Sequence, residues 1–331
     1  MSPSPQRIGV LGAGAWGTAL ATVAARAGHR PVLWSRSPEF AAILNGARIH
    51  PKFPGAVLPQ SILAVSDPRD LTGCDLLIIA TPAQELRTVL ALYPVMANAH
   101  LSVVIAAKGI EIATGKFMAE VLEEVWPLAD PYMWSGPSFA ADVMANQPTA
   151  VTLAGNSLDR ATELAALLSL PAFRIYSSND LLGVQLGGAI KNVLAIACGI
   201  SEGKGFGDSA RAALTTRGFS EMLRFGEAIG ARRSTLTGLS GLGDLILTCS
   251  SRQSRNFSFG LALGRNESTP SRPSEVSGTI EGVPTAKAIA ALAAKRSIDL
   301  PVCEAVNAIL NCRITVDEAI GRLLARPLRA E

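Results

Sequence analysis

The sequence is short of several residue types, and each shortage excludes a class of protein. Charged residues make up only 17% of the 331 residues, and the net charge of +3 includes no run of basic residues and no aromatic residues set among basic ones. A nucleic-acid-binding surface needs such a basic patch, so no nucleic-acid partner is expected. The hydrophobic share of 48% fits a compact globular protein and excludes a disordered one.

Cysteine and histidine are scarce as well. There are five cysteines, an odd number without paired spacing, and three histidines: Cys74, Cys198, Cys249, Cys303, Cys312, His29, His50 and His100. This pattern predicts reduced, mostly buried thiols, as in a cytoplasmic protein, rather than a disulfide framework. Since no cluster of metal-ligating residues is visible, no metal site is expected.

No long apolar run stands out in the sequence. The apolar stretches around residues 76–80 and 103–107 are far too short to span a bilayer, which predicts a protein without membrane insertion. The first five residues lack the charged-then-apolar pattern of a targeting signal. We therefore expect a cytoplasmic location.

The chain is long enough for two domains, and its pattern changes near residue 178. Up to that point, short runs rich in Val, Ile and Leu alternate with helical patterns, which predicts a Rossmann-like α/β domain with a mostly parallel sheet over residues 1–178. The predicted strands are Ile8–Leu11, Pro31–Trp34, Ile62–Val65, Leu76–Ala80, Val103–Ala107, Pro131–Ser135, Ala150–Leu153 and Phe173–Tyr176. Residues 179–331 are predicted to form an all-helical domain, and residues 266–278 an exposed loop.

A glycine-rich turn follows the first predicted strand. Its three glycines, Gly12, Gly14 and Gly17, flank Ala15 and Trp16 in the pattern Gly-x-Gly-x-x-Gly, and an Ala-rich helix follows. In this setting the first glycine permits the tight turn, the second lets the backbone approach a pyrophosphate, and the third lets helix and strand pack. The turn therefore predicts a dinucleotide site at the N-terminus of that helix.

The end of the second predicted strand bears on which nucleotide is bound. An NAD-specific domain usually carries a carboxylate there for the ribose hydroxyls, but this chain has Ser35 and Arg36. A guanidinium can pair with a 2′-phosphate or stack on adenine. The sequence favours NADP(H), or both NADP(H) and NAD(H), and the alternative is that Arg36 is a solvated surface residue.

A lysine lies within an apolar, small-residue helix predicted to begin at Asn179 or Asp180. Gly187 and Gly188 precede Lys191 by one turn, on the same helical face. Because glycine is a poor helix former, two glycines beside a lysine suggest that another group approaches the backbone closely. A desolvated lysine has a lowered pKa and can exchange a proton near neutral pH. From this segment alone, the alternative is a structural lysine neutralised by a carboxylate.

Two strand ends carry further candidates. Lys108 follows the strand at residues 103–107, where nucleotide and substrate are expected to meet. Gly136, Pro137 and Ser138 follow the strand at residues 131–135, and Pro137 is predicted at a first helical position, which makes an anion-binding turn. Either feature alone could be an ordinary loop.

The helical half adds a carboxylate and a polar trio. Asp244 lies among apolar residues, one turn from Thr248, and needs a cationic partner or several hydrogen bonds. Lys191 is the candidate partner. Further on, Ser254, Arg255 and Asn256 suit a phosphate, which arginine can bind bidentately, although an exposed turn would look the same.

Together these motifs resemble the bacterial NAD(P)-dependent glycerol-3-phosphate dehydrogenases, in family order across nearly the whole chain. The matching segments are residues 12–19, 106–109, 135–140, 183–192, 241–245, 253–256 and 281–282. The resemblance implies reversible reduction of dihydroxyacetone phosphate to sn-glycerol 3-phosphate, which supplies the backbone of phospholipids. One departure is Ala15, where family members often have Ser, and it removes one hydroxyl contact to the pyrophosphate.

The resemblance also implies roles for particular residues. Lys191 would donate and accept the proton. The implied substrate-binding residues are Lys108, Gly136, Ser138, Lys191, Asp244, Ser254, Arg255 and Asn256. The implied nucleotide-binding residues are Gly12, Gly14, Ala15, Trp16, Gly17, Arg36, Lys108, Ala140, Arg255, Thr279 and Glu281. The expected partner is a small phosphorylated substrate, with a homodimer as the expected assembly.

Two other functions fit part of the pattern. One is a reductase of the same two-domain plan that acts on a sugar acid or a ketopantoate-like substrate, against which the trio at residues 254–256 favours a terminal phosphate. The other is a regulator that senses the redox cofactor without chemistry, in which an isolated Lys191 and a buried Asp244 would be costly to keep.

Overall fold

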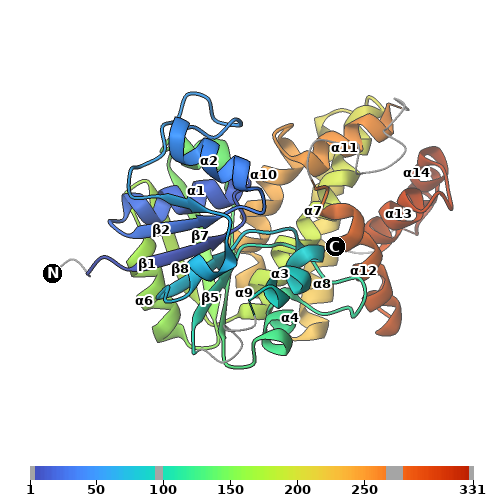
Figure 1. Ribbon diagram of the computed structural model, residues 1–331. Coiled ribbons are helices and arrows are strands. Elements are labelled where there is room, and N and C mark those ends of the chain that lie inside the picture. Colours follow the sequence, from blue (N-terminus) through green and yellow to red (C-terminus); the bar gives the residue numbers. More distant parts are fainter. Residues whose placement is uncertain (1–3, 94–99, 266–278, 328–331) are drawn as a thin grey trace. The chain divides into compact units, whose positions relative to one another are not determined.

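The computed structural model describes residues 4–93, 100–265 and 279–327. Their backbone separates into two compact units, one made of the residues up to Lys108 with Lys116–Gln185, the other of Gly109–Gly115 with the residues from Leu186 onward. The first unit contains the sheet, and the second is helical (Figure 1). The predicted loop at residues 266–278 lies outside the described residues.

One sheet of eight strands forms the centre of the first unit, in the order β3-β2-β1-β4-β5-β6-β7-β8. All neighbours are parallel except β6 and β7, which are antiparallel, so the predicted mostly parallel sheet is confirmed. Each predicted strand is present, with bounds of β1 Arg7–Leu11, β2 Arg30–Trp34, β3 Leu63–Val65, β4 Leu76–Ile79, β5 Ser102–Ile105, β6 Asp130–Ser135, β7 Thr149–Gly155 and β8 Phe173–Ser178.

Helices connect these strands, as parallel strand order requires. Their bounds are α1 Ala15–Arg26, α2 Pro38–Ala47, α3 Leu86–Ala91, α4 Met118–Val125, α5 Ala140–Met144 and α6 Leu158–Leu168, with two short 3₁₀ turns at Pro68–Leu71 and Ala83–Glu85. Strands such as β4 are buried on both faces, which explains their unbroken apolar sequences.

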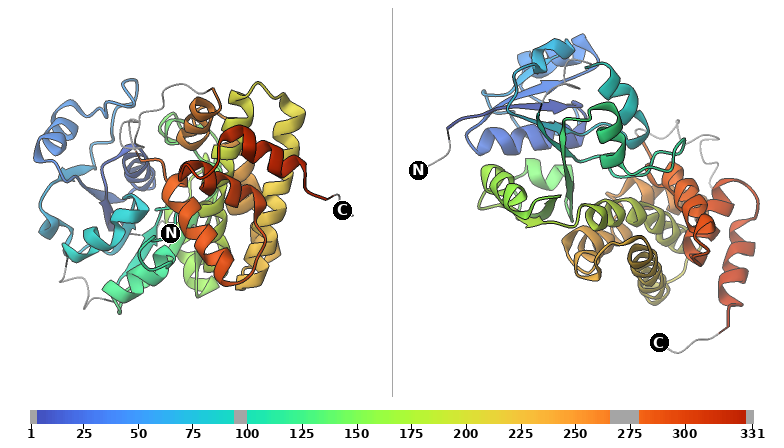
Figure 2. Two further views of the ribbon diagram at one scale, coloured as in Figure 1. Left: turned by 90° about the vertical axis from the view of Figure 1, so that its right-hand side faces the viewer. Right: turned by 90° about the horizontal axis from the view of Figure 1, so that it is seen from below.

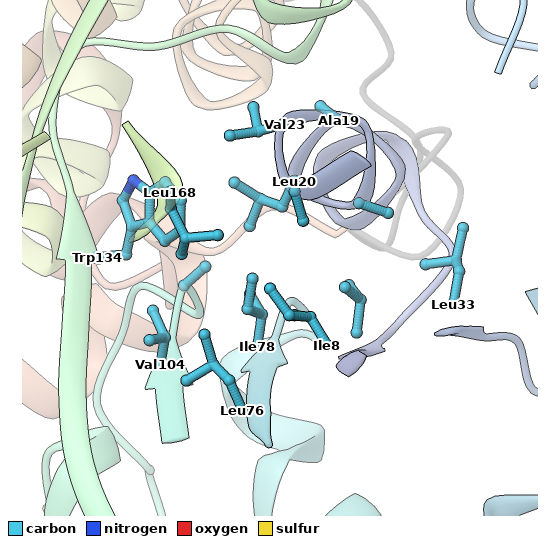
Figure 3. Close-up of a cluster of buried hydrophobic side chains, with 14 of the residues drawn as sticks. Ile8, Ala19, Leu20, Val23, Leu33, Leu76, Ile78, Val104, Trp134 and Leu168 are labelled. Carbon is cyan, nitrogen blue, oxygen red and sulfur yellow. The ribbon is translucent and has the colours of Figure 1, made fainter. Parts of the chain in front are cut away.

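Two apolar clusters cover the two faces of the sheet. On one face, Leu20 and Val23 of α1 pack over Ile8, Ile78 and other strand residues (Figure 3). On the other face, α3 and α4 contribute Leu86, Leu90, Met118 and Leu122. This burial fixes α1, and with it the turn that precedes α1, against the ends of β1 and β4.

The second unit consists of helices, which the yellow-to-red part of the chain shows in both views of Figure 2. It begins within α7, Leu181–Gly203, and continues with α8 Asp208–Ile229, α9 Arg233–Leu236, α10 Asp244–Ser250, α11 Arg255–Gly264, α12 Gly282–Lys295, α13 Pro301–Leu310 and α14 Val316–Leu324. The predicted all-helical second half is therefore confirmed.

Helix α7 is the central helix of the second unit, and Asp180 caps its start by accepting a hydrogen bond from Gly183 N at 2.9 Å. Its glycines allow close packing with α11. A Cβ on Gly199 would lie 2.1 Å from the Phe257 carbonyl oxygen, and one on Gly260 would lie 2.1 Å from that of Ile196. Larger side chains at either position would force the helices apart.

Helix α7 is also longer and more apolar than the short runs considered in the sequence. By length and composition alone it could cross a membrane, but 89% of its most apolar window is buried inside the protein. The core helix of a globular protein passes the same test, and the apolar residues of α7 are core residues here.

One local prediction was wrong. Pro137 does not lie at a first helical position, because α5 begins only at Ala140. Gly136 has a φ of 151° and packs so tightly on β7 that a Cβ there would lie 2.8 Å from Val151 Cα. The chain therefore leaves β6 through a bend and reaches the helix three residues later than predicted.

Candidate functional site

The glycine-rich turn joins β1 to α1 in the first unit. Gly12 has a φ of 113°, a left-handed conformation that favours glycine, and its N–H donates to the Trp34 carbonyl at 3.1 Å. A Cβ on Gly17 would lie 1.8 Å from the Gly12 carbonyl oxygen. The helix can begin directly over the turn only because residue 17 has no side chain.

The start of α1 offers backbone amides that no side chain caps. Its N-cap is Gly14, which is exposed, and a Cβ on Gly14 would meet no atom within 4 Å. The first four N–H groups of a helix have no partner within that helix, and the helix dipole adds partial positive charge there. This arrangement suits a phosphate group approaching the turn.

A buried hydroxyl next to the turn also fits a bound nucleotide. Thr81 Oγ1 is buried and has no hydrogen-bond partner among the described residues. The Thr81 backbone nitrogen lies 3.3 Å from the position of a Cβ on Gly12, so the hydroxyl belongs to a residue that adjoins the turn. Buried polar atoms normally have partners, and a ligand would provide one here.

The other predicted nucleotide residues of the first unit lie in its loops and at a helix start. Arg36 is exposed between β2 and α2, whereas Lys108 is half-buried after β5. Ala140 is the half-buried first residue of α5. Two predicted substrate residues lie just before it, where Ser138 Oγ donates to the Gly136 carbonyl at 3.1 Å.

Lys191 is at the centre of a buried polar group in the second unit. Its Nζ lies 2.5 Å from Asp244 Oδ1 and donates to Thr248 Oγ1 at 3.0 Å. The Thr248 hydroxyl in turn donates to Asp244 Oδ1 at 3.2 Å. Lys191, Asp244 and Thr248 are only 7%, 0% and 3% exposed. The predicted pairing of Lys191 with Asp244 is therefore confirmed.

The glycine beside the lysine has a definite neighbour. A Cβ on Gly187 would lie 2.5 Å from the Ser240 carbonyl oxygen and 3.0 Å from Gly241 Cα. The group that approaches the α7 backbone at Gly187 is thus the π-helical segment Leu239–Gly243, which leads directly into α10. Without a side chain at position 187, this segment can place Asp244 within reach of Lys191.

The predicted phosphate trio lies at the start of α11. Ser254 is the N-cap, and its Oγ accepts from Phe257 N at 3.2 Å. Asn256 is buried and links two other helices, because its Nδ2 donates to Asn192 Oδ1 and its Oδ1 accepts from Gly282 N, each at 2.9 Å. Arg255, between them, is exposed.

These contacts divide the trio by role. Ser254 and Asn256 use their hydrogen bonds to hold the fold, while the exposed guanidinium of Arg255 lies at the first position of a helix N-terminus. Asn192 directly follows Lys191, so the Asn192–Asn256 hydrogen bond ties the start of α11 to the lysine. The structure thus brings Lys191, Asp244 and the trio together within one unit.

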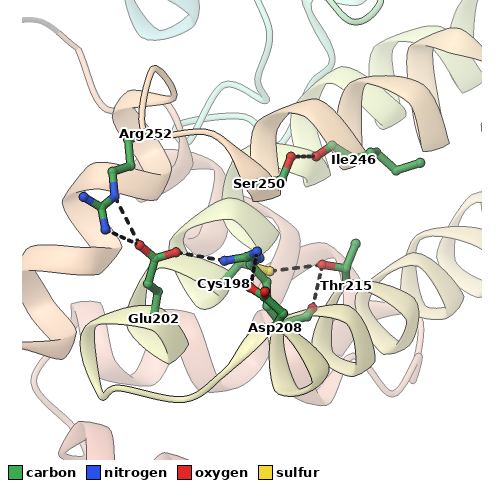
Figure 4. A network of polar contacts seen from close by, with 8 residues as sticks. Cys198, Glu202, Asp208, Thr215, Ile246, Ser250 and Arg252 are labelled. Carbon is green, nitrogen blue, oxygen red and sulfur yellow. Dashed lines mark hydrogen bonds and ion pairs between the residues drawn. The ribbon is translucent and has the colours of Figure 1, made fainter.

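An ion-pair network anchors the chain just before the trio (Figure 4). Glu202, near the end of α7, accepts from Arg252 at 2.7 Å and from Arg211 of α8 at 2.9 Å. Ser258 Oγ also donates to the Arg252 carbonyl at 2.7 Å. Exposed ion pairs contribute little individually, so the network orients the segment more than it stabilises the fold.

Two further predicted nucleotide residues precede α12. Thr279 is half-buried, and Glu281 is the half-buried N-cap of that helix. The next residue, Gly282, is buried, and a Cβ there would lie 2.6 Å from the Asn192 carbonyl oxygen. The start of α12 is therefore held directly against the segment of α7 that carries the lysine.

Two contacts of this group were absent from the predicted site. Thr248 completes the Lys191–Asp244 pair, and its i, i+4 spacing from Asp244 was the only available signal. The Asn192–Asn256 bond joins residues 64 positions apart, and no local pattern reveals such a contact.

The second unit also contains a cavity of about 560 Å³ bordered by α8, α13 and α14. Apolar side chains such as Leu214, Val306 and Ile320 dominate its lining, and none of the predicted site residues borders it. It is therefore separate from the polar group around Lys191.

Comparisons with known proteins agree with this geometry. Residues 7–161 match the family model of the NAD-dependent glycerol-3-phosphate dehydrogenase N-terminus, and residues 180–321 match that of its C-terminus. The chain is 51% identical over 324 residues to a glycerol-3-phosphate dehydrogenase [NAD(P)+] of Bradyrhizobium diazoefficiens, covering 98% of each chain. It is 50% identical over 333 residues to that of Parvibaculum lavamentivorans, covering 100% of each.

Solved structures give the same result. The crystal structure of glycerol-3-phosphate dehydrogenase from Coxiella burnetii matches with a TM-score of 0.92 and 37% identity, over 98% of this chain and 100% of that one. A ketopantoate reductase from Ralstonia eutropha, at 16% identity and a TM-score of 0.62, covers 92% of this chain and 97% of its own, and shares the fold alone. The resemblance inferred from the motifs is confirmed.

Proposed function

The chain belongs to the NAD-dependent glycerol-3-phosphate dehydrogenase family, and we propose that it interconverts sn-glycerol 3-phosphate and dihydroxyacetone phosphate with NAD(P)(H). The observation that carries the assignment of chemistry to residues is the buried Lys191–Asp244–Thr248 group. The product, glycerol 3-phosphate, would supply phospholipid synthesis.

The nucleotide would be held by the first unit together with residues of the second. We assign to it Gly12, Gly14, Ala15, Trp16, Gly17, Arg36, Lys108, Ala140, Arg255, Thr279 and Glu281. The uncapped start of α1 and the unpartnered Thr81 hydroxyl, among the described residues, support this assignment. When bound, the nicotinamide supplies or accepts the hydride that changes the oxidation state of the substrate carbon.

Lys191 would handle the proton. During ketone reduction negative charge develops on the substrate oxygen, where an ammonium group stabilises it and then donates a proton. In the reverse direction the neutral amine removes the proton from the hydroxyl. The contacts from Asp244 and Thr248 support this role because they hold Nζ in one place.

The substrate would be bound by Lys108, Gly136, Ser138, Lys191, Asp244, Ser254, Arg255 and Asn256. Within the trio, we assign the direct phosphate contact to the guanidinium of Arg255, with Ser254 and Asn256 fixing the start of α11 under it. Binding energy from the phosphate then positions the reacting carbon.

Several broader expectations remain proposals. We propose residues 1–178 as the NAD(P)-binding domain, residues 179–331 as the substrate and catalytic domain, and the enzyme as a cytoplasmic homodimer without membrane insertion. The burial of α7 inside the protein supports the last of these. Light scattering on the purified protein measures the assembly.

The direct test compares two substrates. NADPH and NADH oxidation should proceed with dihydroxyacetone phosphate and be far slower with unphosphorylated dihydroxyacetone. Arg255→Lys keeps the charge but loses the planar fork. Because a charge-assisted hydrogen bond contributes about 1.5–3 kcal/mol, this variant should lose roughly ten- to one-hundred-fold in kcat/KM with the phosphorylated substrate.

The matched control is Arg252→Lys, three residues earlier, where the guanidinium pairs with Glu202. It should leave kcat/KM nearly unchanged. An equal fractional loss on both ketones in Arg255→Lys would show that Arg255 does not bind the substrate phosphate.

A further inference from the structure

A histidine in the first unit contacts the glycine-rich turn from its protein side. His50 lies between α2 and β3, is 3% exposed, and packs edge-on to Phe40 at 5.4 Å and beside Phe53 at 5.2 Å between ring centroids. It is not among the residues assigned to substrate or nucleotide. Both of its ring nitrogens have partners in the protein.

The two partners fix the tautomer of the ring. His50 Nδ1 accepts a hydrogen bond from Lys52 N at 3.0 Å, so the proton of the neutral ring is on Nε2. The ring also hydrogen-bonds to the backbone of Ala13, a bond that favours the protonated ring and therefore runs from a ring N–H to the Ala13 carbonyl. Burial lowers the pKa of His50, which keeps the ring neutral in this arrangement.

The Ala13 carbonyl belongs to the peptide between the first two glycines of the turn. Thr18 Oγ1 donates to the same carbonyl at 3.4 Å. A trans peptide directs its C=O and N–H groups in opposite directions. Because His50 and Thr18 hold the carbonyl on the protein side, the N–H of Gly14 points to the other side, where Gly14 is exposed and open space surrounds it.

We propose that His50 is a positioning residue for the nucleotide, which holds the Ala13–Gly14 peptide so that the Gly14 N–H faces the phosphates of NAD(P)(H). This inference rests on the proposed use of the turn as the nucleotide site. It gives a side chain that touches no ligand a measurable share of cofactor affinity.

The chain contains a matched control histidine. His29, in the same unit, is 2% exposed, accepts from Gln6 N at 3.2 Å and bonds through Nε2 to the Leu167 carbonyl at 2.9 Å. Its burial and its pair of backbone bonds match those of His50, but it follows the far end of α1. Removing either ring should cost similar stability, whereas only His50 should affect the nucleotide.

The experiment measures the Kd of NADPH and of NADH directly by fluorescence titration, together with thermal unfolding. Since one hydrogen bond contributes about 0.5–1.5 kcal/mol, His50→Phe should raise both Kd values roughly three- to ten-fold. His29→Phe should lower Tm to a similar extent and leave Kd unchanged. At saturating nucleotide, the KM for dihydroxyacetone phosphate should not change in His50→Phe.

Two conservative variants isolate the bond to Ala13. The amide nitrogen of Gln can take the place of Nε2, so His50→Gln should bind the nucleotide within about two-fold of the parent, given the size of one hydrogen bond. The shorter Asn keeps only the acceptor for Lys52 and should bind as weakly as His50→Phe. These variants also preserve the test if His50→Phe does not fold.

The proposal is overturned if His50→Phe lowers Tm without changing Kd, or if His50→Gln and His50→Asn bind equally weakly. It is also overturned if the parent binds neither nucleotide. A parent that binds NADPH but does not oxidise it with dihydroxyacetone phosphate would instead contradict the proposed reaction and leave the role of His50 intact.

Discussion

The two units provide for anionic ligands in different ways. In the first, the candidate site is built from backbone, with glycines at positions 12, 14 and 17 and a helix start that no side chain caps. In the second, it is built from buried side chains, with Lys191 and Asp244 paired in the interior. The backbone site depends on the absence of side chains, and the side-chain site depends on burial.

The starts of two helices show the same contrast on a smaller scale. Ser254 caps α11 with its own hydroxyl, whereas Gly14 leaves the amides of α1 without a side-chain cap. A capped start satisfies its own amides, and an uncapped start can accept a phosphate. We infer that α1 binds its ligand mainly through backbone amides and that α11 does so mainly through the exposed Arg255.

The largest effect should follow from removing the buried cation. Lys191→Ala should reduce kcat by roughly 10²–10⁴-fold, the range for loss of general acid–base catalysis, while the Kd of NADPH stays near that of the parent. Steady-state kinetics and nucleotide titration measure the two. Near-normal turnover would leave Lys191 as a structural cation.

This variant also leaves Asp244 buried without its charge partner, which typically costs about 3–5 kcal/mol of stability. The double variant Lys191→Met, Asp244→Asn removes both charges and should unfold at higher urea than Lys191→Ala while remaining inactive. Lys204→Ala, just after the end of the same helix and in an ion pair with Asp317, is the control that should keep turnover.

A smaller and more selective effect is expected at the backbone-built site. Arg36→Asp should raise the KM of NADPH by roughly ten- to one-hundred-fold, the usual contribution of a charge-assisted hydrogen bond, and affect NADH much less. A carboxylate repels the 2′-phosphate but accepts from the ribose hydroxyls. Kinetics with both nucleotides measure this ratio.

The control lies on the same strand. Arg30, exposed at the amino end of β2, can be changed to Asp with the same change in charge. It should leave the ratio of the two KM values unchanged. If Arg36→Asp impairs both nucleotides equally, Arg36 does not contact the 2′ position.

A second buried carboxylate in the helical unit tests what a cationic partner contributes. Glu221 of α8 is 2% exposed and accepts from Val302 N at 2.7 Å and Cys303 N at 3.2 Å, at the start of α13. Burial raises the pKa of Glu221 to about 7, against the opposing effect of these hydrogen bonds. Backbone amides therefore do not fully compensate the burial of this carboxylate.

The smallest effect, on stability rather than catalysis, should appear here. Because the folded-state pKa lies above the unfolded value of 4.5, the folded state binds more protons, and stability falls as pH rises from about 4.5 through 7. Between pH 5 and 8, Glu221→Gln should gain about 2–3 kcal/mol relative to the parent. Urea unfolding at both pH values measures this, and parallel pH profiles would contradict it.

Much of the fold was predictable from local sequence. All eight strands were expected because buried parallel strands are continuous apolar runs. The glycine-rich turn was recognisable because its geometry requires glycine at fixed spacing. The error at Pro137 arose because the packing of Gly136 against β7, 15 residues later, delays the helix.

Sequence by itself determined the order of elements, the position of the phosphate-binding turn and the need of Asp244 for a cation, because each depends on neighbours in the chain or on the cost of burying charge. Only the tertiary structure decided that Thr248 joins Lys191, that Asn256 bonds to Asn192 and that His50 holds the Ala13 carbonyl. These contacts join residues far apart in the chain, and their partners are selected by packing geometry, which no local pattern encodes.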